Sequence, residues 1–412
     1  MTNQIRPSRR AWRTGAALAV GAALVLGACS SSSDTATGGA APSSTAGTGT
    51  SIDGTAGTTP GTVATPRSPV PGAEWETADP ASLGFDPAKL DQLSASAESG
   101  GSNCLLVVRD GKIVEEDYYG DKTAESAQEV FSATKSYSST LVGIAQDEGL
   151  LDIDDKASDY IDEWKGTPSE SVTIRNLLSN DSGRFYEYET DYFKMAAAAP
   201  DKTQFAIDLT QADPPGTVWE YNNSAIQTLD RVLTKATGMS PTDYANEKLL
   251  GPIGMADSTM TKDQAGNTRT FMGLQSTCRD MARFGVLMLN KGNWDGEQLV
   301  SEAWVDDATG HASQDLNGAY GFLWWLNRTG PQQGSDQATA GEGGAAAKVG
   351  QMVPGAPEDV YWALGAGGQY IAVHPTSGIV AVRLAPVNAP EGSTRFGNGD
   401  LSLAVEDALV DP

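Results

Sequence analysis

The sequence predicts an α+β fold, in which one antiparallel sheet is flanked by helices and a mostly helical lobe is inserted. Residues 104–108 and 113–119 are rich in β-branched and aromatic side chains, and similar runs return in the C-terminal third. Helical signals dominate between them, over about residues 131–255. Strands at both ends of a domain are expected to pair in one sheet, and a cleft between sheet and lobe is the expected site.

Local signals place the individual elements. Apolar residues at helical spacing predict a helix over residues 85–97. The next two strands flank Asp110-Gly111, a strong β-hairpin signal. Residues 330–357 are rich in Gly, Ala and Gln and too long for a simple connection, so they form either a mobile flap or a passive insertion. The later elements are expected to be a helix over residues 225–237, strands over 320–326, 361–364, 370–373 and 379–384, and a closing helix over 401–409.

Composition excludes several classes of partner. The 412 residues carry a formal charge of −25, which disfavours binding to nucleic acid. Two His and three Cys are too few for a zinc site of the usual type, so we expect no metal.

The N-terminus has the pattern of a targeting segment. Four Arg precede an apolar run over residues 16–26, which is too short to span a bilayer but fits a secretory signal peptide. The run ends in Leu26-Gly27-Ala28-Cys29, which resembles the lipobox of bacterial lipoproteins and implies lipidation of Cys29; the alternative is an ordinary cleavage site with a chance Cys. We therefore expect a signal peptide at 1–28, a Ser/Thr/Gly/Ala/Pro-rich tether at 29–73 and a folded domain at 74–412.

Lipid chains would then be the only attachment to the membrane, because a chain this acidic is repelled by anionic lipids. The implied compartment is extracytoplasmic and oxidising. Cys104 and Cys278 either form a disulfide there or remain two buried thiols.

The chemistry begins at Ser132, the only Ser in the chain that stands three residues before a Lys, here Lys135. Residues i and i+3 share a helix face, so the amine lies beside the hydroxyl if a helix starts here. The alternative is a Ser cap with a solvated Lys. Tyr221 and Asn223 follow 89 and 91 residues later, between a Pro-Gly turn and another helix.

Four motifs in this order resemble those of the serine β-lactamase and penicillin-binding superfamily. The likeness is greatest to its class C branch, which also holds esterases, D-amino-acid peptidases and nylon-oligomer hydrolases, and it covers the chain from about residue 74 to its end. The motifs are Phe131-Ser132-Ala133-Thr134-Lys135, Leu177-Leu178-Ser179-Asn180-Asp181-Ser182-Gly183, Pro215-Gly216-Thr217-Val218-Trp219-Glu220-Tyr221-Asn222-Asn223 and Gly365-Ala366-Gly367-Gly368-Gln369.

The resemblance implies a role for each motif residue. Ser132 would be the nucleophile that forms an acyl-enzyme, and Lys135 would either share its proton or lower the pKa of Tyr221. Tyr221 would act as general base and then protonate the leaving group, while the backbone N–H groups of Ser132 and Gln369 would form the oxyanion hole. The residues expected to bind substrate are Asn223, Gly367, Gly368 and Gln369.

One position departs from the family pattern. The family usually places Lys or His before the glycines of the last motif, where this chain has Ala366. A substrate-carboxylate anchor is therefore missing, which disfavours a β-lactamase or peptidase more than a general ester or amide hydrolase. Arg184 or Arg383 could replace it, although a structural or surface role is favoured for both.

The sequence thus predicts a monomeric, lipid-anchored serine hydrolase acting on a small ester or amide without a cofactor. The alternatives are a β-lactamase or D-Ala-D-Ala carboxypeptidase, and a non-catalytic binding lipoprotein of the same fold. A Ser-His-Asp triad is disfavoured, because no G-x-S-x-G sequence occurs and His374 lies where a strand meets a proline.

Overall fold

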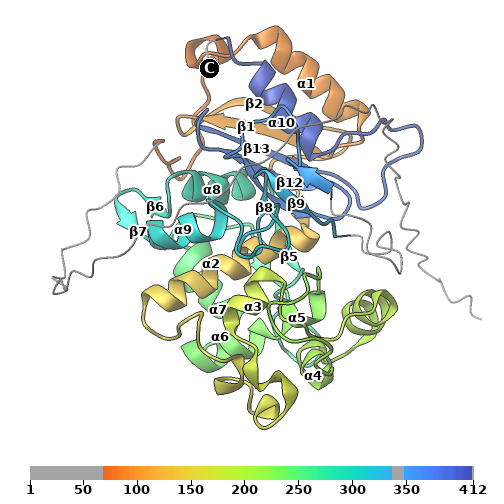
Figure 1. The fold of residues 1–412 in the computed structure, drawn as a ribbon. Helices are drawn as coiled ribbons and strands as arrows, with labels where there is room; N and C mark the ends of the chain where they lie inside the picture. Colours follow the sequence, from red (N-terminus) through yellow and green to blue (C-terminus); the bar gives the residue numbers. More distant parts are fainter. Residues whose placement is uncertain (1–67, 336–347, 411–412) are drawn as a thin grey trace, which may run out of the picture. The chain divides into compact units, whose positions relative to one another are not determined.

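The computed structural model describes residues 68–335 and 348–410 (Figure 1). The predicted signal peptide, Cys29 and most of the tether lie outside these residues. Ser68, the first described residue, contacts the domain through its backbone N–H, which donates to Asn290 Oδ1 at 2.8 Å. Arg283 donates to the carbonyls of Gly72 and Ala73 at 2.7 and 2.9 Å. The last residues assigned to the tether are therefore packed against the domain.

The central sheet has six strands in the order β2-β1-β13-β12-β11-β8, and every neighbouring pair is antiparallel. Cys104 pairs with Leu384, so strands from the two ends of the domain lie side by side. This confirms the predicted fold class. The strands are β1 (Cys104–Arg109), β2 (Lys112–Tyr118), β8 (Trp325–Leu326), β11 (Tyr361–Gly365), β12 (Gln369–His374) and β13 (Ile379–Leu384).

Two turns show how local sequence acts on the sheet. Asp110 and Gly111 join β1 to β2 with φ angles of 51° and 69°, the left-handed pair of a two-residue hairpin. The prediction of a strand over 320–326 is largely wrong, since only Trp325 and Leu326 form a strand and Tyr320 makes an isolated bridge to Trp325. Leu323 has a φ of 59° and donates its N–H to Leu178 O at 3.1 Å, which interrupts the strand.

Helices cover both faces of the sheet (Figure 1). The helices α1 (Pro87–Ser99) and α10 (Asn398–Asp407) pack on each other and on one face, and α8 (Cys278–Leu289) packs on the other. Gly285 permits this close approach, because a Cβ there would lie 2.4 Å from Val380 Cγ1. A further helix, α9 (Glu302–Thr309), follows α8.

The inserted lobe is helical, as predicted, and spans η2 (Phe131–Ala133) to η7 (Asn246–Leu250). The expected helix over 225–237 is divided in two at Thr228. No helix in the described part of the chain is long and apolar enough to cross a membrane. Between η2 and η7, the helices of the inserted lobe are α2 (Thr134–Asp147), α3 (Ile174–Ser179), the π-helix η6 (Glu189–Ala198), α4 (Lys202–Asp208), α5 (Asn223–Gln227), α6 (Leu229–Thr237) and α7 (Pro241–Ala245), with short 3-10 turns at Ala157–Asp159, Asp162–Trp164 and Pro168–Ser171.

Three small sheets complete the domain. One has the strand order β3-β5-β4, and the other two are the hairpins β6-β7 and β9-β10. The last hairpin lies at the base of the 330–357 insertion, whose residues 336–347 are outside the described part, so the flap stays a prediction. The strands are β3 (Gln128–Glu129), β4 (Thr259–Met260), β5 (Leu274–Ser276), β6 (Asn293–Trp294), β7 (Glu297–Gln298), β9 (Gly330–Gln332) and β10 (Lys348–Gly350).

Cys104 of β1 and Cys278 at the start of α8 form a disulfide across 174 residues of sequence. Closing so long a loop removes much of the entropy of the unfolded chain. Reduction of this bond is expected to lower the free energy of unfolding by about 2–5 kcal/mol, measured by denaturant titration with and without reductant. A Cys104→Ala/Cys278→Ala variant should be equally destabilised and should not respond to reductant. Identical unfolding midpoints in all samples would contradict the prediction.

Candidate active site

Ser132 lies in the short helix η2, directly before α2. The preceding residue, Phe131, has a φ of 48°, a left-handed conformation that is unusual for a bulky side chain and typical of functional sites. The end of β11 lies against this segment, since a Cβ on Gly365 would come within 2.1 Å of Val130 O. The fold therefore brings the nucleophile motif next to the Gly-rich turn between β11 and β12.

Lys135 is one turn further along and is buried, with 1% of its surface exposed. Its Nζ lies 2.9 Å from Ser132 Oγ, 2.7 Å from Asn223 Oδ1 and 2.8 Å from Phe271 O. The two latter atoms can only accept hydrogen bonds. They therefore take two N–H groups of Lys135, and the third direction of the nitrogen points at the Ser132 hydroxyl.

Burial sets the charge of this amine. The loss of hydration disfavours the ammonium form and lowers the pKa of Lys135 from 10.5 to about 7, while the negative charge of Asp191 acts in the opposite direction. A substantial fraction of Lys135 is then uncharged at neutral pH. A neutral amine whose two hydrogens are held by acceptors directs its lone pair toward Ser132 Oγ.

Tyr221, in the motif of residues 215–223, also reaches the hydroxyl of Ser132. Its side chain is hydrogen-bonded to Ser132 and is buried, with its ring stacked on Trp325 at 5.6 Å between centroids. Burial raises the pKa of Tyr221 far above its ordinary value, against a smaller opposing effect of the Ser132 bond. The phenol is therefore protonated near neutral pH, and the alternative in which Lys135 lowers the pKa of Tyr221 stays a prediction.

Asp191 of η6 is a site residue that sequence reasoning missed. Its carboxylate is 1% exposed and accepts hydrogen bonds from the backbone and side chain of Asn223 at 3.2 and 2.7 Å. It also accepts from the backbone and hydroxyl of Ser224 at 2.7 and 2.6 Å. Because Asn223 Nδ2 donates to Asp191, its Oδ1 must face Lys135. No motif or periodicity marks Asp191.

The last motif, residues 365–369, is held in place by its own packing. Gly367 and Gly368 have φ angles of 79° and 96°, and a Cβ on Gly368 would lie 2.1 Å from Arg383 Nη1. The Gln369 side chain is buried and donates to Ala385 O at 2.7 Å. The turn therefore requires these two glycines. The side chain of Gln369 stabilises the fold, and its backbone N–H is the group expected to bind substrate.

Neither arginine considered as a carboxylate anchor is free. Arg184 is 2% exposed, donates to Ala206 O at 2.9 Å and stacks over Trp164 at 4.3 Å. Arg383 is 4% exposed and donates to Phe396 O and Gly100 O, both at 2.9 Å. Both are structural, as favoured from the sequence.

His374 lies at the opposite end of β12 from Gln369, about 16 Å along the strand at 3.3 Å per residue. It is buried and its Nδ1 lies 2.7 Å from Glu406 Oε1. The structure therefore does not bring it to Ser132. Within residues 68–335 and 348–410, no three His, Cys, Asp or Glu side chains lie close enough to hold a metal ion.

The profile of the beta-lactamase family matches residues 90–405 of the chain. The chain belongs to the beta-lactamase family. It is 24% identical over 275 residues to the 6-aminohexanoate-dimer hydrolase of Paenarthrobacter ureafaciens, which covers 60% of this chain and 69% of that protein. It is 28% identical over 153 residues to penicillin-binding protein 4 of Amycolatopsis lactamdurans, covering 36% of this chain and only 40% of that protein. The family match and the named hydrolase relative show that the chain is a β-lactamase-related serine hydrolase.

Solved structures of the beta-lactamase family share the fold. A Bacillus anthracis protein assigned as a 6-aminohexanoate-dimer hydrolase aligns with a TM-score of 0.62 and 20% identity over 85% of this chain and 89% of that chain. The D-alanine carboxypeptidase AmpC of Burkholderia cenocepacia aligns with a TM-score of 0.52 and 18% identity over 80% and 99%. At these identities the similarity establishes the fold alone, and the substrate must be inferred from the residues of the site.

Proposed function

We propose that this beta-lactamase family member is a lipid-anchored, extracytoplasmic hydrolase that forms an acyl-enzyme on a small ester or amide. The observation that carries the proposal is the position of the Lys135 amine. Asn223 Oδ1 and Phe271 O hold two of its hydrogens, and its third direction lies 2.9 Å from Ser132 Oγ. A buried amine with a lowered pKa in this position activates a Ser hydroxyl without any His.

The proposed reaction assigns each proton to a group. Lys135 takes the proton of Ser132 Oγ as this oxygen attacks the substrate carbonyl, and the backbone N–H groups of Ser132 and Gln369 stabilise the oxyanion. Tyr221 gives its proton to the leaving alcohol or amine and is reprotonated from the Lys135 ammonium. Water then attacks the acyl-enzyme with the same groups acting in reverse order, which releases the acid and restores Ser132.

The site favours substrates that do not depend on a carboxylate anchor. Ala366 stands where the family usually has Lys or His, and the guanidinium groups of Arg184 and Arg383 are engaged with backbone carbonyls. A neutral amide or ester therefore fits better than a penicillin or a peptide C-terminus. The name of the P. ureafaciens relative, 6-aminohexanoate-dimer hydrolase, agrees with hydrolysis of a small amide, although a 6-aminohexanoate dimer itself carries a carboxylate.

The proposed location depends on the N-terminus and on the cysteines. Residues 26–29 resemble a lipobox, with Cys29 as the lipidated residue, and a Ser/Thr/Gly/Ala/Pro-rich stretch follows. The Cys104–Cys278 disulfide agrees with an oxidising compartment. Incorporation of labelled palmitate into wild-type protein, but not into Cys29→Ser, tests the anchor.

Intact-mass spectrometry tests the reaction. The full-length protein is mixed separately with a p-nitrophenyl ester and with a penicillin, quenched and weighed beside Ser132→Ala. We expect one acyl adduct from the ester on the wild-type chain and none on the variant. A stable adduct from penicillin alone would favour the penicillin-recognising alternative. The absence of adduct and turnover with every reagent would favour a binding lipoprotein.

A further inference from the structure

A pocket of about 320 Å³ lies where the end of η6 meets the start of α4 and the turn after β4. Three cationic side chains line it, those of Lys202, Lys262 and Arg269, with a single carboxylate, that of Asp263. The chain as a whole carries a formal charge of −25. A local excess of positive charge in so acidic a protein requires an explanation.

Lys202 is the buried cation of the pocket. It is 7% exposed, and its Nζ donates to Ala199 O at 2.8 Å and Met195 O at 3.4 Å. In the part of the chain that the structure describes, no carboxylate lies within ion-pair distance of it. Burial and the positive charge of Arg269 lower the pKa of Lys202, while the negative charge of Asp263 acts in the opposite direction.

Arg269 keeps donors that the protein does not use. Its Nη1 lies 3.8 Å from Glu129 Oε2 and 3.4 Å from Thr261 Oγ1, both long contacts. Its Nε is buried and has no hydrogen-bond partner among the described residues. A guanidinium group presents five N–H donors in a planar fork that matches the oxygens of a carboxylate or phosphate.

Asp263 compensates these three cations only in part. Its Oδ1 accepts from the backbone N–H groups of Ala265 and Asn267 at 3.0 and 2.9 Å, and its Oδ2 accepts from the backbone of Lys202 at 2.8 Å. The carboxylate thus closes a turn in the chain. Among the described residues, Lys262 forms a single ion pair, which is exposed and long at 3.7 Å, with Asp243.

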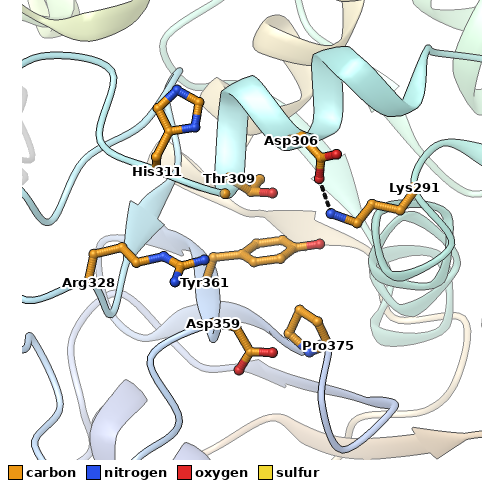
Figure 2. Close-up of a pocket in the computed structure, with 9 residues that line it drawn as sticks. Lys291, Asp306, Thr309, His311, Arg328, Asp359, Tyr361 and Pro375 are labelled. Atoms are coloured by element: carbon orange, nitrogen blue, oxygen red, sulfur yellow. Dashed lines mark hydrogen bonds and ion pairs between the residues drawn. The ribbon is translucent and has the colours of Figure 1, made fainter.

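Another pocket of the domain provides a contrast (Figure 2). Lys291 and Arg328 line it together with Asp306 and Asp359, so cations and carboxylates are equal in number. Figure 2 shows Lys291 joined to Asp306 by an ion pair. A positive excess is therefore not a general property of pockets on this protein.

We propose that the pocket formed by Lys202, Lys262 and Arg269 binds an oxyanion group, a carboxylate or a phosphate, of a small ligand. The anion accepts from the guanidinium of Arg269 and from the ammonium of Lys202, and so removes the repulsion between them. Lys262, at the exposed side, attracts the anion from solution. The site does not depend on Ser132 chemistry.

Isothermal titration of the full-length protein at neutral pH and constant ionic strength tests this site, with inorganic phosphate and glutarate as probes. We expect saturable binding of at least one probe to one site, weakened about tenfold or more in Arg269→Gln, as the loss of a charge-assisted contact predicts. Lys262→Gln should weaken binding measurably but less, because it loses only the attraction of the anion from solution. Arg328→Gln, in the balanced pocket, is the matched control and should bind as wild type does.

The exposed Lys262 keeps the test decisive even if a change at a more buried cation disturbs folding. Tighter binding of phosphate or of glutarate identifies which oxyanion the pocket prefers. The proposal is overturned if neither probe binds saturably, or if Arg328→Gln weakens binding as much as Arg269→Gln and Lys262→Gln do.

Discussion

Replacing Lys135 with Met is expected to lower kcat/KM for ester or amide hydrolysis by about a thousandfold, the middle of the range for a lost general base. Met has similar length and no basic nitrogen, so Ser132 Oγ loses the group 2.9 Å away that takes its proton. The acylation rate, measured by rapid quench and intact mass, should fall by the same factor. Substrate binding should change little, because the proposed role of Lys135 is in proton transfer.

The pH dependence of the wild-type enzyme checks the same role. The active form of Lys135 is the neutral amine, and burial lowers its pKa to about 7. The value of kcat/KM should therefore be low in acid, rise through about pH 7 and level off above it. An acid limb centred near the ordinary pKa of a Lys would contradict this assignment.

Lys248→Met is the control for Lys135→Met, because it makes the same substitution at a Lys on the surface. Lys248 forms ion pairs with Glu148 and Glu247 at 2.9 and 3.4 Å, outside the site, and its replacement should leave kcat/KM within about twofold of wild type. Circular dichroism must show that Lys135→Met is folded, because Asn223 Oδ1 and Phe271 O lose their donor. A folded Lys135→Met enzyme with activity within tenfold of wild type would exclude Lys135 as the base.

The sequence predicted those features that local pattern or motif spacing determines. The β-branched and aromatic enrichment and the Asp110-Gly111 turn identified β1 and β2, and the i, i+3 spacing brought Lys135 beside Ser132. Tyr221 and Asn223 could be added only through the family resemblance, because their approach to Ser132 depends on tertiary packing. The structure brings these four residues together.

Other features depend on contacts that no sequence pattern records. Asp191 meets Asn223 across 32 residues, from a π-helix without a recognisable motif. The strand expected over 320–326 is interrupted by the left-handed Leu323, a conformation that Leu rarely adopts. The cationic pocket gathers Lys202 and Arg269 from separate segments, whose charges look like ordinary surface charges in the sequence.

Replacing Asp191 with Asn is expected to lower kcat/KM by about 10- to 100-fold and to move the acid limb of the pH profile to lower pH. The carboxylate accepts four hydrogen bonds from Asn223 and Ser224, and an amide offers one oxygen and two donors in its place. Losing one or two such charge-assisted bonds at about 1.5–3 kcal/mol gives the expected fall in rate if Asn223 no longer holds Lys135 in position.

The direction of the pH shift separates an electrostatic role from a structural one. The negative charge of Asp191 raises the pKa of Lys135, so its removal lowers that pKa further and makes the neutral amine available at lower pH. Ser224→Ala removes one donor to Asp191 and keeps its charge, so its acid limb should coincide with that of wild type. If Asp191→Asn loses activity while its acid limb stays in place, the carboxylate only supports the fold of η6 and α5, and the charge of the Lys135 site is set by burial alone.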